Sequence, residues 1–135
     1  ALGPQRSNGL YPIATIDQFH GRIVMSSDWP ATSMNPLEGI EIAITRQAPG
    51  GVGPINHPEQ RIRLELALRA YTLNAAWVAR EDEIDGSLEV GKAADLIVLD
   101  RNLFRIKPTG IHSARVLLTL LDGEPAYRSR GFKFN

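Results

Sequence analysis

The sequence predicts an α/β fold followed by a small antiparallel sheet. Residues 12–44 are typical of helix, strand and helix in succession, because an apolar run at 22–28 lies between two stretches with apolar residues at helical spacing. Residues 116–127 are typical of a β-hairpin, because Asp122-Gly123 suits the positive φ angles that a type I′ turn requires. Helix, strand and helix is the repeating unit of parallel α/β architectures, although this stretch supplies a single strand of that kind.

The first helix is expected over residues 12–20. Its apolar positions recur three residues apart, Pro12 suits the first helical position, and Gly21 suits a C-terminal cap. The apolar run that starts at Arg22 follows directly and ends in polar residues at Asp28. This pattern predicts a buried strand with a carboxylate at its carboxyl end.

A second helix is expected to begin at Asn35. Asn35 can cap it, Pro36 suits its first turn, and Glu38 can reach back as in a capping box. Its apolar face would be formed by Leu37, Ile40 and Ile44, with Ala43 beside them. The Gly- and Pro-rich residues 48–58 then predict an exposed, mobile connection. A phosphate-binding loop is not favoured there, because the stretch has neither a preceding strand nor a Lys-Ser/Thr ending.

The last part of the chain is expected to change from helices to strands. Helical periodicity extends over residues 62–70 and 72–78. Residues 86–92 read as a short strand with a glycine turn, and residues 94–100 read as a strand rich in branched side chains. Pro125 cannot donate to a ladder, which places the last arm of the hairpin at an edge or at a non-bonded position.

Composition and charge exclude several classes of function. The 135-residue chain is long enough for one domain with a core, and its 15 basic and 15 acidic residues balance without a basic run. Neither nucleic acid nor a membrane is therefore an expected partner. The absence of cysteine excludes disulfides, a thiolate zinc site and a cysteine nucleophile. No apolar run could cross a bilayer and the start lacks the apolar stretch of a signal peptide, so a cytoplasmic protein is expected.

Asp28 is the candidate site residue. In parallel α/β folds the carboxyl ends of the strands are where loops converge and ligands bind, and a strand fixes the side chain that it carries there. The alternative is that Asp28 only stabilises a turn before Pro30, which is a common role of aspartate. The local pattern leaves both interpretations open.

Four stretches of the chain together resemble the C-terminal portion of a metal-dependent amidohydrolase. They are, in order, Ser27-Asp28-Trp29-Pro30, Asn35-Pro36-Leu37, residues 67–76 and residues 86–100. The block Gly-Ser-Leu-Glu-x-Gly-Lys-x-Ala-Asp-Leu at 86–96 is similar to a block in the small β domain of that superfamily. The Ser-Asp-Trp-Pro step most resembles amidohydrolase family 3, the YtcJ-like branch.

The resemblance implies a (β/α)8 TIM-like barrel followed by a small β-sandwich. Residues 1–80 would be the C-terminal barrel segment with its last β/α unit, and residues 81–135 would be part of the β-sandwich. Asp28 matches the aspartate that, in the family, lies beside a divalent metal, expected to be zinc, and accepts a proton from the attacking water. The implied activity is hydrolysis of carbon–nitrogen bonds other than peptide bonds in a small-molecule substrate. A metal that acidifies water and a carboxylate that carries its proton are a known combination for such chemistry.

The chain also departs from the family pattern. The family's His-x-His pair, bridging carboxylated lysine and further histidine ligands have no counterpart, and structural roles are expected for His20, His57 and His112. By itself the chain is expected to bind no metal and to be inactive. Two hypotheses stay open: a C-terminal fragment of a hydrolase, and a non-catalytic interaction module derived from an amidohydrolase tail. The lone parallel strand predicts a homo-oligomer or a complex with a missing N-terminal part.

Overall fold

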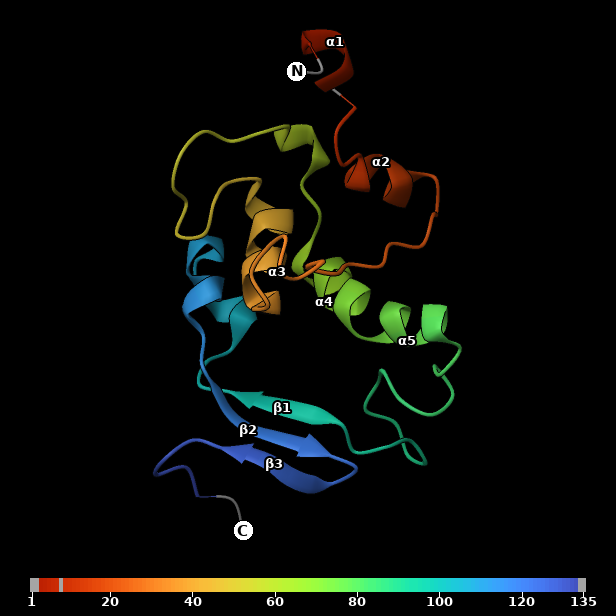
Figure 1. Cartoon of the computed structure of the whole chain (residues 1–135), viewed down its shortest axis with the longest axis vertical. Helices are drawn as coiled ribbons and strands as arrows, with labels where there is room; N and C mark the ends of the chain where they lie inside the picture. Colours follow the sequence, from red (N-terminus) through yellow and green to blue (C-terminus); the bar gives the residue numbers. More distant parts are fainter. Residues whose placement is uncertain (1–2, 8, 134–135) are drawn as a thin grey trace.

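The computed structural model describes residues 3–7 and 9–133, so residues 1, 2, 8, 134 and 135 of the expected domains lie outside the described residues. It places a group of short helices beside a three-stranded sheet (Figure 1). In chain order the elements are α1 (Pro4–Ser7), α2 (Ile13–Gln18), α3 (Pro36–Thr45), η1 (Pro58–Gln60), α4 (Leu64–Tyr71), α5 (Leu73–Ala79), β1 (Leu96–Leu99), η2 (Leu103–Arg105), η3 (Pro108–Ser113), β2 (Val116–Leu121) and β3 (Glu124–Arg128). Among the described residues no helix combines the length and the apolar content needed to span a membrane.

The helix α2 is shorter than expected, and its C-cap is Phe19, two residues before the predicted Gly21. Pro12 stands at the N-cap, and the amide of Gly21 donates to the carbonyl of Ile16 over 2.9 Å. A Cβ on residue 21 would lie 2.5 Å from Cγ2 of Ile16, so the chain can turn this closely only at a glycine. The turn directs the next segment towards the other helices (Figure 1).

The predicted helix over residues 35–44 is confirmed as α3. The Asn35 side chain accepts a hydrogen bond from the amide of Leu37 over 3.1 Å, as the capping pattern predicts. The amide of Asn35 donates to Oγ of Ser33, so Ser33 takes the place that the capping box assigned to Glu38. The helix ends at Arg46, whose φ of 61° is left-handed and whose amide bonds to the carbonyl of Ile42.

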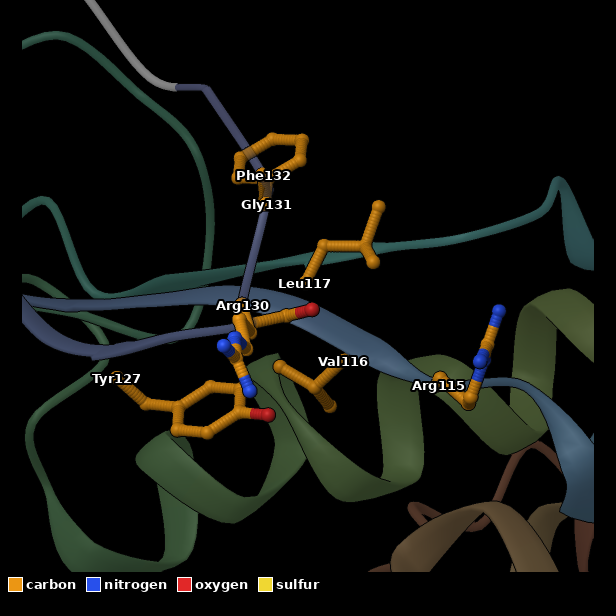
Figure 2. Close-up of a pocket in the computed structure, with 8 residues that line it drawn as sticks. Arg115, Val116, Leu117, Tyr127, Arg130, Gly131 and Phe132 are labelled. Carbon is orange, nitrogen blue, oxygen red and sulfur yellow. The ribbon is translucent and has the colours of Figure 1, made fainter.

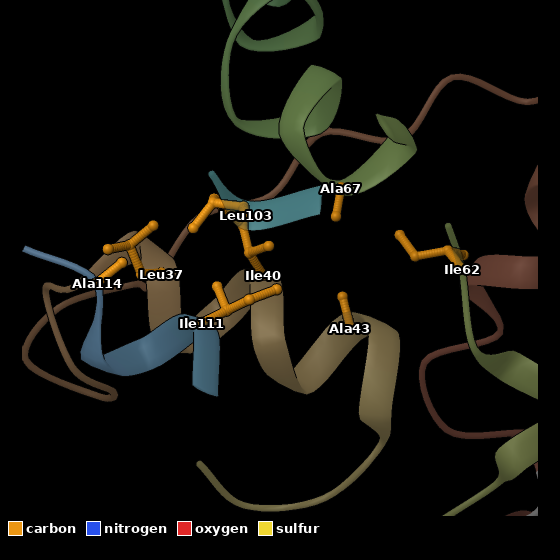
Figure 3. Close-up of a cluster of buried hydrophobic side chains, with 8 residues drawn as sticks. All are labelled: Leu37, Ile40, Ala43, Ile62, Ala67, Leu103, Ile111 and Ala114. Carbon is orange, nitrogen blue, oxygen red and sulfur yellow. The ribbon is translucent and has the colours of Figure 1, made fainter. Parts of the chain in front are cut away.

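The hydrophobic core forms where α3 packs against α4 and η3 (Figure 3). Its buried side chains come from both the helical part of the chain and the segment between β1 and β2: Leu37, Ile40, Ala43, Ile62, Ala67, Leu103, Ile111 and Ala114. Burial of such aliphatic groups contributes about 25 cal/mol per Å² of apolar surface. The core therefore joins the two parts of the chain that the sequence pattern separates.

The strand expected over residues 22–28 is not formed. The described sheet has the order β1-β2-β3, and this segment is extended chain lying against helices. The amide of Met25 donates to the carbonyl of Ala70 over 3.1 Å, and Nδ2 of Asn74 donates to the carbonyl of Ile23 over 2.8 Å. A strand requires a neighbour with a row of free backbone groups, and α4 and α5 offer none, so single hydrogen bonds replace a ladder. The β/α unit of the predicted fold class is therefore present only as an extended segment and a helix.

The small antiparallel sheet is confirmed. β1 pairs with β2, and β2 pairs with β3, both antiparallel. The hairpin turns at Asp122 (φ 50°) and Gly123 (φ 81°), which are the positive values that a type I′ turn needs. The carboxylate of Asp95 accepts from the amide of Asp122 over 2.6 Å and ties this turn to the residue before β1. Pro125 lies on β3, an edge strand, as its missing donor predicts.

The prediction of a strand over residues 86–92 is wrong. These residues form turns beside Lys92. Nζ of Lys92 donates to the carbonyls of Asp82 and Asp85 and, over 2.7 Å, to Oγ of Ser87. Glu89 completes the group with an ion pair of 3.6 Å. Within 86–92 the amides of Glu89 and Lys92 donate to the carbonyls of Ser87 and Glu89, each over 3.2 Å, so the backbone bonds locally and not to another strand. Gly86 is required as well, because its φ is 79° and a Cβ there would lie 2.6 Å from Cβ of Ala76.

Candidate functional site

Asp28 lies in the loop that connects the extended segment to α3, which we call the Asp28 loop (residues 26–35). Its side chain is exposed, and its φ of 49° is in the left-handed region. The carbonyl of Asp28 accepts from the amide of Ala31 over 2.8 Å, and the amide of Asp28 donates to Oγ of Ser26 over 3.3 Å. Within the described part of the chain these hydrogen bonds involve the Asp28 backbone, so its carboxylate remains accessible to an external group. Asp28 therefore lies on a turn, and its carboxylate does not serve as the cap of that turn.

The Asp28 loop is joined to the core at its C-terminal end. Oγ1 of Thr32 donates to the carbonyl of Ser27, which closes the loop across Asp28. At the far end, Nδ2 of Asn35 donates to the carbonyl of His112 over 3.4 Å, while the Asn35 oxygen caps α3. The loop is therefore held both by its own side chains and by a residue of η3.

The three histidines lie on separate elements and each has a partner of its own. The amide of His20 bonds to the carbonyl of Asp17 at the end of α2. Nδ1 of His57 lies 3.2 Å from Oε1 of Glu59. His112 contacts Glu41, as described next. Among residues 3–7 and 9–133, no three histidine, cysteine, aspartate or glutamate side chains are grouped so that they could hold a metal ion.

Sequence reasoning missed a buried carboxylate, Glu41. It is fully buried, and its oxygens accept from the amide of Gly50 over 2.6 Å, from the amide of His112 over 2.8 Å and from Nδ1 of His112 over 2.7 Å. Glu41 thereby connects α3 to the glycine-rich connection and to η3. The signal was present in the sequence, because a charged residue stands between Leu37 and Ile44 on the apolar face of the helix. The connection over 48–58 is accordingly anchored, with Gly50 bonded to this carboxylate.

Removing the Glu41 carboxylate is expected to destabilise the protein by about 3 kcal/mol, because Glu41→Ala would remove the buried acceptor of the partly buried hydrogen bonds from Gly50 and His112. Urea denaturation measures this change in the free energy of unfolding. Glu38→Ala on the same helix is the matched control, and only about 0.5 kcal/mol is expected from its place near the helix N-terminus. Equal unfolding midpoints for the two variants would contradict this role of Glu41.

A groove of about 710 Å³ lies on the sheet and its C-terminal extension (Figure 2). It is lined by Arg115, Val116, Leu117, Tyr127, Ser129, Arg130, Gly131 and Phe132. Arg115 is engaged by Asp100, whose carboxylate accepts from Nε of Arg115 over 3.1 Å and from Arg101 over 2.8 Å. Hydrogen bonds from Arg101 and from the Arg115 backbone hold the pKa of Asp100 well below its usual range. The groove offers aromatic and basic groups but no carboxylate or histidine for proton transfer.

Comparison with known proteins shows the family to which the chain belongs. The model of the amidohydrolase family matches residues 1–127, which is most of the chain. The match includes both the Asp28 loop and the turns at residues 86–92. The chain belongs to amidohydrolase family 3. The family predicted from the Ser-Asp-Trp-Pro step and the Gly-Ser-Leu-Glu-x-Gly-Lys block is thus confirmed.

Curated relatives of this family 3 chain come from bacteria and a plant. It is 31% identical over 122 residues to an N-substituted formamide deformylase of Arthrobacter pascens, covering 90% of this chain and 22% of that protein. It is 36% identical over 108 residues to the protein LONG AFTER FAR-RED 3 of Arabidopsis thaliana, covering 78% of this chain and 18% of that protein. It is 28% identical over 102 residues to the putative amidohydrolase YtcJ of Bacillus subtilis, covering 75% and 19%.

The family 3 chain thus spans about a fifth of the length of the curated relatives that it matches. No solved structure gives a significant match to it.

Proposed function

We propose that this chain is the C-terminal portion of a hydrolase that cleaves carbon–nitrogen bonds other than peptide bonds, and that Asp28 transfers the proton during the reaction. The observation that carries the proposal is the accessible carboxylate of Asp28 on a hydrogen-bonded turn within the segment that matches the amidohydrolase family. A general acid or base must reach its substrate while its backbone stays in place. The exposed carboxylate and the hydrogen-bonded backbone of the Asp28 loop support this role.

The proposed fold of the intact protein divides the chain into two regions. Residues 1–80 would form the last part of a (β/α)8 barrel, and residues 81–135 would form part of a small β-sandwich. The change from helices to an antiparallel sheet between α5 and β1 supports this division. In such a barrel the extended segment at residues 22–28 would gain the strand neighbours that α4 and α5 do not provide. Completing the barrel and the sandwich requires either a missing N-terminal part or another copy of the chain.

The described residues do not supply a complete site for a divalent metal. Asp28 offers one accessible carboxylate, and no three potential ligands are grouped within the part of the chain that the structure describes. We propose that the other ligands come from the rest of a longer protein, with zinc as the expected ion. When bound, such a metal would supply a water molecule that ionises near neutral pH.

Asp28 itself would accept a proton from the nucleophile and donate it to the leaving amine. A carboxylate can do both, since it gains the proton in the first step and loses it in the second. The exposed position of Asp28 allows contact with water and substrate, and its backbone hydrogen bonds to Ser26 and Ala31 hold its place. Substrate choice in barrels of this type depends on loops at the carboxyl ends of the strands.

The proposal is tested by assaying the full-length protein against N-substituted formamides, simple acyl amides and a dipeptide. We expect amine release from at least one of the first two groups and none from the dipeptide. Mass spectrometry of the products identifies the bond that is broken. A protein that releases amine from no substrate, or only from the dipeptide, would contradict the proposed function and would favour the non-catalytic module.

A further inference from the structure

The backbone on either side of Asp28 is held by two side chains that bind the same peptide group. The amide N–H of Asp28 donates to Oγ of Ser26 over 3.3 Å. The carbonyl of Ser27, which belongs to the same peptide group as that N–H, accepts from Oγ1 of Thr32. The two hydroxyls therefore fix both ends of one planar unit.

This peptide group matters because it sets the direction of the Asp28 side chain. Rotation about φ of Asp28 moves its carboxylate relative to the peptide group before it, and φ stands at 49°. Few residues other than glycine adopt this region, and aspartate tolerates it better than most, so hydrogen bonds to the flanking peptide groups are sufficient to hold it. The hydrogen bond from the amide of Ala31 to the carbonyl of Asp28 holds the following peptide group in the same way. Asp28 thus lies between two restrained peptide groups.

We propose that Thr32 and Ser26 are positioning residues that aim the Asp28 carboxylate at the reacting atoms, an inference that rests on the proposed function of Asp28. We expect Thr32 to restrain the loop more than Ser26 does. The hydroxyl of Thr32 bonds across the loop to a residue five positions away, whereas Ser26 bonds to a residue two positions away. Both side chains are exposed, so they contribute little to the core. Their hydrogen bonds therefore serve the geometry of the loop.

The test uses the full-length protein with Thr32→Val, which keeps the side-chain shape and removes the hydroxyl, and Thr32→Ser, which keeps the hydroxyl. We expect Thr32→Val to lower kcat about tenfold with KM almost unchanged, because a small misplacement of a catalytic group slows the chemical step. Thr32→Ser is expected to retain nearly all of the wild-type kcat. Ser26→Ala should show a smaller loss in the same direction. Melting temperature and metal content should stay at their wild-type values in all three variants.

Each result separates this inference from the function on which it rests. Normal kcat in Thr32→Val, together with an inactive Asp28→Asn, would overturn the positioning role and leave the proposed function intact. Normal kcat in both variants would overturn the proposed function. If Thr32→Val loses activity only together with a lower melting temperature, or if Thr32→Ser is equally impaired, then the hydroxyl does not position Asp28 and the inference fails.

Discussion

Replacing Asp28 with asparagine in the full-length protein is expected to lower kcat by about a thousandfold, within the range that a general acid or base contributes. The amide has the shape of the carboxylate but cannot accept the proton. The hydrogen bonds of the Asp28 loop that involve residue 28 are made by its backbone, so the variant can form them too. Kinetic assays of kcat and KM on a substrate identified by the amide screen measure this effect.

Asp17→Asn is the matched control for Asp28→Asn, because it makes the same chemical change on α2, outside the Asp28 loop. We expect wild-type kcat from the control and an unchanged melting temperature from both variants. Substantial turnover in Asp28→Asn would exclude Asp28 from proton transfer. A large drop in its melting temperature would instead show that the residue is needed for folding.

Removing divalent metal from the full-length protein is expected to abolish turnover. Dialysis against a chelator, followed by metal analysis, prepares the metal-free protein, and addition of zinc should restore activity. The chain of residues 1–135 by itself should bind zinc only weakly in a calorimetric titration, because a single carboxylate does not make a zinc site. Full activity of a protein shown to be metal-free would contradict the metal-dependent mechanism. Tight, stoichiometric zinc binding by the isolated chain would contradict the proposed origin of the ligands.

The elements that the sequence predicts correctly are those specified by neighbouring residues. Asn35 caps α3 by bonding to an amide two residues away, and the hairpin depends on the Asp122-Gly123 turn. The close approach of Gly21 to Ile16, five residues earlier, is likewise local, although the C-cap of α2 is Phe19. Such interactions form within a few residues, so their patterns can be recognised without knowledge of the rest of the fold.

The predictions that failed depend on what lies beside a segment in space. The apolar run at 22–28 has the composition of a buried strand, but its neighbours are α4 and α5, which cannot extend a ladder. Residues 86–92 have the branched and glycine residues of a strand and turn, yet Lys92 at their end bonds back to the carbonyls of Asp82 and Asp85 and holds the segment in turns. An apolar or branched run bounded by turn residues does not distinguish these cases from a true strand.

The sequence pattern around Asp28 indicates the candidate residue, but it does not indicate the conformation of the loop that carries it. The sequence points to Asp28 because it ends the apolar run at 22–28 and stands in the Ser-Asp-Trp-Pro step, whereas its positive φ and its two hydroxyl partners appear only in the structure. Glu41 was missed because periodicity assigns it to the apolar face without naming a partner, and that partner, His112, lies 71 residues away. Contacts over such distances are set by tertiary packing, which local patterns do not contain.

The hydrogen bonds that anchor the extended segment at residues 22–28 also determine when this segment can fold during synthesis of the chain. The carbonyl of Ile23 is held by Asn74, and the amide of Met25 is held by the carbonyl of Ala70. Both anchors are translated after Asp28, and the ribosome adds only about 5 to 20 residues per second. While α4 and α5 are still within the exit tunnel, the emerging segment lacks both of these hydrogen bonds. The path of the chain leading to Asp28 is therefore fixed only once the second of these helices has left the ribosome.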